Sequence, residues 1–218
     1  MLKKYNNDLD AITPELALEI LMDGNQRFQN GLTAHKDFLS KVELTGKVQK
    51  PFAVLLSCMD SRAPVEHLFD QGIGDVFSVR MAGNIISENV LGSLEYAVAV
   101  VGSKLIMVMG HSNCGAIKGA IDDVNMGNLT QLLHKIKPAV ESAKEKVDNH
   151  CSSNKAYVDA VAELNVANSV QSILNQSPII RELVMTKKIM LVGAMYCVEK
   201  GAVRILEPEH IKSQGQLN

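Results

Sequence analysis

The sequence predicts an α/β fold in which a mostly parallel β-sheet is flanked by helices. Short strand-like runs, most of them continuously apolar as in strands buried on both faces, recur at residues 51–56, 76–80, 105–109 and 189–194. Segments of helical periodicity separate these runs, and such alternation favours a parallel sheet. The chain has 218 residues, 46% of them hydrophobic, so it can bury a sizeable core, and we expect a single domain over residues 1–218.

An N-terminal helical arm is predicted within residues 1–45. Thr13 is a favourable N-cap, Pro14 suits the first turn of a helix, and Gly31 follows the last apolar position of the periodic pattern. Such a helix packs either on the core of its own chain or on a second subunit. The sequence favours neither arrangement strongly.

The central part of the fold is expected over residues 51–120. Between the strands at 76–80 and 105–109, apolar residues recur at helical spacing, which predicts a strand–helix–strand unit with a right-handed crossover. A helical region over residues 129–187 follows, with apolar stripes and no convincing linker. Residues 188–207 are expected to form the C-terminal strands, with a tight turn at 199–201.

Charge and hydropathy exclude several classes of partner. The chain carries 22 basic and 24 acidic side chains, mixed along its length, so it lacks the basic stripe that a phosphate backbone requires, and no nucleic acid is expected. The longest apolar runs are far shorter than the roughly 20 residues that span a bilayer, so no membrane partner is expected. Residues 1–7 carry charge without a following apolar region, which predicts a cytoplasmic location, or a periplasmic one if a signal peptide has been removed.

The four cysteines do not form a disulfide scaffold. Cys58 ends the first strand-like run, and Cys114 follows the third. Cys151 lies in a polar stretch and Cys197 in an apolar run, and both are interpreted as incidental, with a disulfide between them as the weaker alternative. The first pair therefore differs from the second in its position on the predicted sheet.

Cys58, His111 and Cys114 are candidate ligands of a catalytic zinc ion. Zinc binds sulfur and nitrogen ligands in a tetrahedron, and three protein ligands leave the fourth position open for water. The carboxyl ends of neighbouring parallel strands meet at one edge of a sheet, where ligands bind in open α/β folds, so the separation of these residues in sequence is no obstacle. The alternative is that the cysteines are only small buried hydrophobic residues.

Asp60 and Arg62 favour the metal site over that alternative. The two residues follow a buried strand directly and are spaced so that their side chains point to the same side of an extended segment. An ordinary salt bridge would explain them. Beside a metal-bound hydroxide, however, Arg62 would keep Asp60 ionised, and an ionised carboxylate accepts a hydrogen bond but cannot donate one.

Three motifs together resemble the β-class carbonic anhydrases: Cys58-Met59-Asp60-Ser61-Arg62, Arg80-Met81-Ala82-Gly83-Asn84 and His111-Ser112-Asn113-Cys114-Gly115. Their order and spacing match that family across residues 49–120. The resemblance implies one Zn²⁺ per chain, bound by the two cysteines and the histidine. It also implies that the pair Asp60 and Arg62 gates the fourth ligand position, which Asp60 itself fills in a closed state.

The resemblance further implies a substrate pocket at a dimer interface. The positions that match this pocket are Gln49, Phe77, Ala82, Tyr96 and Gly115. From the sequence pattern alone, Phe77 and Tyr96 would be interpreted as core residues. The family takes some of these side chains from the neighbouring subunit, so a homodimer or homotetramer is expected.

The activity implied is reversible hydration of carbon dioxide to bicarbonate and a proton, by attack of zinc-bound hydroxide. Hydrolysis of carbonyl sulfide or carbon disulfide at the same site is one alternative, and a catalytically inactive zinc-binding protein is another. A thiol redox enzyme is disfavoured because the Cys-x-x-Cys spacing is missing. Met59 and Met81 depart from the residues most common in the family, but neither removes a ligand.

Overall fold

The computed structural model describes residue 5 and residues 8–207, and it contains a five-stranded sheet in the order β2-β1-β3-β4-β5. The strands are β1 (Ala53–Ser57), β2 (Val76–Arg80), β3 (Leu105–His111), β4 (Met190–Tyr196) and β5 (Val203–Ile205). The pairs among β1 to β4 are parallel, and only β5 is antiparallel to its neighbour. The prediction of an α/β fold with a mostly parallel sheet is confirmed.

Strand register brings the carboxyl ends of three strands to the same edge. Ser57 at the end of β1 pairs with Met109 of β3, and His111 at the end of β3 pairs with Tyr196 of β4. At the other side of the sheet, β2 has only β1 as a neighbour, so it is an edge strand. The edge where the strands end therefore carries the residues that follow β1 and β3.

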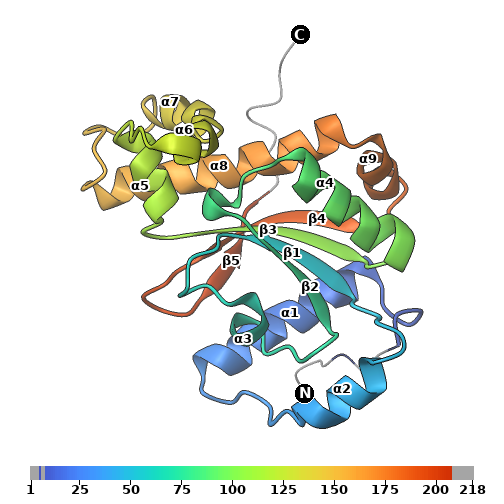
Figure 1. The fold of residues 1–218 in the computed structure, drawn as a ribbon. Helices are drawn as coiled ribbons and strands as arrows, with labels where there is room; N and C mark the ends of the chain where they lie inside the picture. Colours follow the sequence, from blue (N-terminus) through green and yellow to red (C-terminus); the bar gives the residue numbers. More distant parts are fainter. Residues whose placement is uncertain (1–4, 6–7, 208–218) are drawn as a thin grey trace.

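Helices cover both faces of the sheet (Figure 1). The helices are α1 (Pro14–Gln29), α2 (Phe38–Thr45), α3 (Val65–Leu68), α4 (Glu88–Glu95), α5 (Gly115–Ile121), α6 (Gly127–His134), α7 (Lys137–Ala143), α8 (Lys155–Gln176) and α9 (Pro178–Met185). A short 3₁₀ turn, η1, covers Ala82–Asn84, and a π-helix, η2, covers Tyr96–Val101. Figure 1 shows α1 and α3 on one side of the sheet and α4 and α8 on the other.

The first helix packs on the core of its own chain, which answers the question that the sequence left open. The Thr13 hydroxyl accepts the backbone N–H of Leu16, as expected of an N-cap. Ile20 and Leu21 are buried in the same cluster as Leu55 and Leu105 of the sheet. In contrast, α2 buries none of its residues.

The region predicted to be helical over 129–187 consists of four helices rather than one continuous pattern. Irregular structure at residues 144–154 separates α7 from α8, and Asn149 there has a φ of 60°. Asn154 caps α8 by accepting the N–H of Ala156. Short polar side chains that bond to nearby backbone end one helix and begin the next.

Helix α8 approaches the sheet closely because two strands carry glycine beneath it. A Cβ atom placed on Gly110 of β3 or on Gly193 of β4 would lie 2.7 or 2.9 Å from a methyl group of Val166. Gly110 therefore belongs to a strand, and β3 extends two residues beyond the predicted end at Met109. None of the helices in the described part of the chain is both long and apolar enough to cross a membrane.

Candidate metal centre

The structure brings Cys58, His111 and Cys114 together at the carboxyl edge of the sheet. Cys58 follows β1 directly, His111 is the last residue of β3, and Cys114 is the N-cap of α5. All three are buried, and their ligand atoms lie within 4.8 Å of one another. The two sulfur atoms are 4.0 Å apart, close to the roughly 3.8 Å that tetrahedral zinc with Zn–S bonds of about 2.3 Å requires.

The imidazole of His111 is oriented as a metal ligand. Its Nδ1 atom lies 3.0 Å from the backbone carbonyl oxygen of Ser112, which accepts a hydrogen bond when Nδ1 carries the proton. Nε2 is then left with a lone pair, and it is buried without a hydrogen-bond partner. Because a buried polar atom without a partner is costly, an Nε2 that faces two cysteine sulfurs fits a metal ion bound there.

The thiols of Cys58 and Cys114 interact with each other, and this interaction shifts their pKa values in opposite directions. The hydrogen bond from the Cys114 thiol lowers the pKa of Cys58 to about 4, with smaller contributions from His111 and from the Gly83 backbone. The same interaction with Cys58, together with burial, raises the pKa of Cys114. A divalent cation would stabilise both thiolates at once, as metal binding by cysteine requires.

Asp60 and Arg62 form a two-point ion pair beside this group. The Asp60 Oδ1 atom accepts Nε of Arg62 at 2.9 Å, and Oδ2 accepts Nη2 at 2.8 Å. This pairing lowers the pKa of Asp60 to about 2. Oδ2 also lies 3.8 Å from Nε2 of His111, so the ionised carboxylate faces the ligand group.

Arg62 and Arg80 donate hydrogen bonds that connect the backbone segments around the site. Arg80 at the end of β2 donates to the backbone carbonyls of Cys58 and Asp60, at 3.2 and 2.5 Å. Arg62 donates to the carbonyl of Asn113, at 3.3 Å, and so connects the segment after β1 to the segment after β3. The sequence places Arg80 within a motif, but gives no sign that it bonds to the backbone of the first ligand.

The five predicted substrate-pocket residues divide into two groups. Ala82 and Gly115 lie at the site, since Ala82 precedes the residue whose N–H contacts Cys58, and Gly115 follows Cys114 at the start of α5. Gln49 lies four residues before β1, at the opposite end of that strand from Cys58. One chain therefore brings Ala82 and Gly115 to the ligands, but not Gln49.

Phe77 and Tyr96 are also remote from the ligands of their own chain. Phe77 pairs with Val54, which is four residues before Cys58, or about 13 Å along the strand. The rings of Phe77 and Tyr96 are in edge contact at a centroid distance of 6.2 Å and line an open groove. Tyr96 is 48% exposed, so the interpretation as a core residue is wrong for Tyr96 within this chain.

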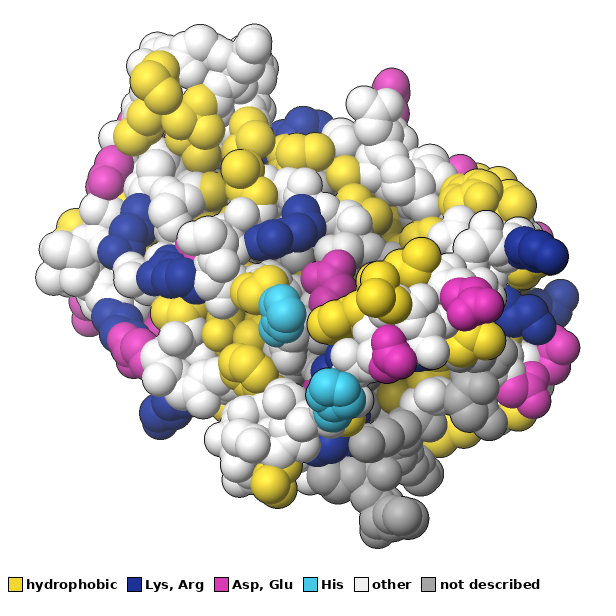
Figure 2. All heavy atoms as spheres, turned by 60° about the horizontal axis from the view of Figure 1, so that its bottom comes forward, with side chains coloured by type: hydrophobic (Ala, Val, Ile, Leu, Met, Phe, Trp, Pro, Cys, Tyr) yellow, Lys and Arg dark blue, Asp and Glu magenta, His cyan; other side chains and the backbone are white. Residues whose placement is uncertain are grey.

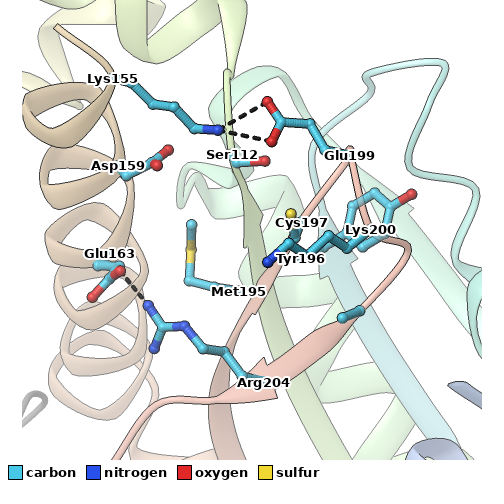
Figure 3. Close-up of a pocket in the computed structure, with 11 residues that line it drawn as sticks. Ser112, Lys155, Asp159, Glu163, Met195, Tyr196, Cys197, Glu199, Lys200 and Arg204 are labelled. Atoms are coloured by element: carbon cyan, nitrogen blue, oxygen red, sulfur yellow. Dashed lines mark hydrogen bonds and ion pairs between the residues drawn. The ribbon is translucent and has the colours of Figure 1, made fainter. Parts of the chain in front are cut away.

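A cavity of about 320 Å³ lies beside Ser112, the residue that follows β3, between α8 and the turn from β4 to β5 (Figure 3). Ser112 lines it, and so does Cys197. Two ion pairs cross it: Lys155 bonds to both carboxylate oxygens of Glu199, and Arg204 bonds to Glu163. Cys151 and Cys197 are both free, so the alternative of a disulfide between them is wrong.

The fold and the site define an enzyme of the α/β class with a buried Cys–His–Cys metal-type centre at the carboxyl edge of its sheet. A family model described as carbonic anhydrase matches residues 53–203. The chain belongs to the β-class carbonic anhydrases, whose general activity is the hydration of carbon dioxide.

Individual relatives agree with this assignment. Carbonic anhydrase 2 of Mycobacterium tuberculosis is 35% identical over 205 residues, which cover 93% of this chain and 97% of that protein. A carbonic anhydrase of Mycolicibacterium smegmatis is 33% identical and covers 88% of this chain and 93% of its own length.

Solved structures show the same fold. A tetrameric β-carbonic anhydrase of Sordaria macrospora superposes with a TM-score of 0.69 at 29% identity, covering 84% of this chain and 90% of that one. A Coccomyxa β-carbonic anhydrase in complex with acetazolamide gives a TM-score of 0.70 at 27% identity, covering 85% of this chain and 84% of that one.

Proposed function

We propose that this chain is a zinc enzyme that catalyses the reversible hydration of carbon dioxide to bicarbonate and a proton. The observation that carries the proposal is the buried, unpartnered Nε2 of His111, which faces two cysteine sulfurs and lies beside an ionised carboxylate. Cys58, His111 and Cys114 would hold the ion. Zinc bound in this way supplies a nucleophile by lowering the pKa of water toward neutrality.

Asp60 is proposed to orient the reacting oxygen. Both of its carboxylate oxygens accept hydrogen bonds from Arg62, and the low pKa keeps it ionised at every pH at which the enzyme would work. An ionised carboxylate would accept a hydrogen bond from the attacking group and, later, one from the hydroxyl of bicarbonate, while the proton itself stays on that oxygen. In a closed state, Asp60 would leave Arg62 and itself bind the ion in place of water. Its Oδ2 atom already lies 3.8 Å from Nε2 of His111.

We further propose that two copies of the chain complete each substrate pocket. Gln49, Phe77 and Tyr96 are remote from the ligands of their own chain, so a second copy is needed to bring them to a metal site. Several large hydrophobic side chains before β1 are exposed and available for such an interface: Leu32, Phe38, Leu39, Val42, Leu44 and Val48. In the view of Figure 2, hydrophobic side chains lie exposed among charged ones of both signs.

Metal analysis combined with stopped-flow hydration of carbon dioxide tests the proposal. We expect one zinc ion per chain and a hydration rate well above the uncatalysed rate at pH 8.5. Asp60→Asn is expected to keep its zinc and to lose about 100-fold in kcat, because an amide can donate to the attacking oxygen instead of accepting from it, which misorients that oxygen. Asp123→Asn, which removes one member of an exposed ion pair with Lys137, is the matched control and should keep full activity.

Wild-type protein that holds one zinc per chain but does not hydrate carbon dioxide at pH 8.5 would overturn the proposal. Carbonyl sulfide and carbon disulfide are assayed on the same preparation. Faster turnover of either than of carbon dioxide would reassign the substrate while leaving the metal site intact.

A further inference from the structure

A tight turn at residues 81–84 packs against the first metal ligand. The Met81 N–H donates to the carbonyl of Ser57 at 3.0 Å, and the Asn84 N–H closes the turn on the carbonyl of Met81 at 2.8 Å. Within the turn, the backbone N–H of Gly83 donates to the sulfur of Cys58 at 3.4 Å. The turn therefore delivers a hydrogen-bond donor to a ligand atom.

The backbone of this turn needs residues that tolerate a positive φ. Gly83 has a φ of 66° and Asn84 a φ of 43°, so two consecutive residues are left-handed. Glycine and asparagine adopt this conformation more readily than other residues, so the sequence permits the turn and the surrounding contacts select it. The space beside Gly83 is also filled, because a Cβ atom there would lie 2.7 Å from Cδ1 of Ile136.

Helix α8 supplies the contacts that enforce the turn. The side-chain amide of Asn165 donates to the carbonyl of Gly83 at 2.8 Å, and the hydroxyl of Ser169 donates to the carbonyl of Asn84 at 3.2 Å. Both side chains are buried, with 3% and 4% exposure. They are four residues apart, so they lie on the same face of the helix, one turn from each other.

We propose that Asn165 is a positioning residue of the metal centre, which fixes Gly83 so that its backbone N–H points at the sulfur of Cys58. The inference rests on the proposed function only for the identity of the ligands. A thiolate that accepts an N–H bond gives less electron density to a bound metal, and groups around the ligands tune the metal in this way. Asn165 thus acts on the centre through Gly83, without touching a ligand itself.

Cobalt(II) in place of zinc tests the inference, because the energy of the thiolate-to-cobalt charge-transfer band reports the electron density on sulfur. We expect Asn165→Leu, which keeps about the size of the side chain but removes the amide donor, to move this band to longer wavelength. Asn165→Ala, which also removes the donor, should do the same and serves if the leucine variant does not fold.

Ser169→Ala is the matched control. It removes an equally buried hydrogen bond from the same helix to the same turn, but that bond ends on Asn84 rather than Gly83, so its band should stay at the wild-type position. Folded Asn165 variants with the wild-type band, or a Ser169→Ala band shifted equally, would overturn the inference. Wild-type protein that shows no thiolate-to-cobalt band would instead disprove the ligand set on which the proposed function depends.

Discussion

At the scale of single residues, Asp70 shows how strongly this fold depends on a buried charge. Its side chain is fully buried and accepts hydrogen bonds from Arg27 and Lys36. Burial raises the pKa of Asp70, but the bonds to the two cations outweigh it, and the pKa is lowered overall. These contacts join α1 and the segment before α2 to the end of α3.

Replacing Asp70 by alanine should cost about 3–5 kcal/mol of unfolding free energy, because it leaves Arg27 and Lys36 without their shared carboxylate. Urea denaturation followed by circular dichroism measures the change. Asp123→Ala, which breaks an exposed ion pair, should change stability far less than Asp70→Ala. Equal effects of the two substitutions would show that the buried position of Asp70 is not what matters.

The Asp60–Arg62 pair predicts a pH dependence whose sign follows from the lowered pKa. Asp60 has a pKa of about 2 in the folded chain, against an ordinary value of 3.8. Its contribution to stability is therefore fully present above about pH 4 and is lost as the pH falls toward 2. We expect the difference in urea midpoint between wild type and Asp60→Asn to shrink steadily from pH 5 to pH 2, and a constant difference would contradict the assignment.

The clustering of the three candidate ligands was predictable from the sequence, whereas the contacts that support them were not. Cys58, His111 and Cys114 lie in short motifs at the ends of apolar runs, so local pattern and sheet topology suffice to bring them together. The bond from Asn165 to Gly83 joins residues 82 positions apart. No local pattern encodes such a contact, because it depends on how α8 lies across the sheet.

At the scale of secondary structure, the contact between α8 and the sheet fixes how closely the two layers approach. Gly193→Ala should destabilise the chain by about 1–3 kcal/mol, because the new methyl group would lie 2.9 Å from Val166. In the double variant with Val166→Ala the clash disappears. We expect the double variant to be more stable than the sum of the two single effects predicts by at least about 0.5 kcal/mol.

Urea denaturation of the four proteins in this cycle measures the coupling, and strict additivity would show that the layers adjust without strain.

The same contact explains a limit of the sequence-based prediction. A glycine at the end of an apolar run predicts the end of a strand. Gly110 instead continues β3, and its lack of a side chain leaves room for Val166 of α8. Strands and helices with clear periodicity were predictable, whereas a position set by the approach of two layers was not.

At the scale of the whole molecule, the proposed shared pocket predicts complementation between inactive chains. Cys58→Ser removes a ligand, and a chain with both Gln49→Ala and Tyr96→Ala lacks pocket residues that it would lend to its neighbour. Each should be poorly active alone. After co-refolding, half of the dimers are hybrids with one intact site of two, so about a quarter of wild-type activity should return.

Stopped-flow hydration measures this recovery, and activity equal to the mean of the two parents would exclude a shared pocket. The tetrameric state of the Sordaria relative is consistent with self-association. The number of subunits and the cytoplasmic location stay predictions. The sequence pattern could not show that Gln49, Phe77 and Tyr96 are remote from their own ligands, because that follows from strand direction and register.

The edge strand β2 has a practical consequence for handling the protein. Its outer side is not paired with another strand of the described chain, and the half-buried Phe77 lies on it. Unpaired strand edges with apolar side chains are templates for indiscriminate association. Separation of the proposed dimer on dilution should therefore expose this edge and give irreversible inactivation rather than a population of well-behaved single chains, so storage at high protein concentration should prolong the working life of the enzyme.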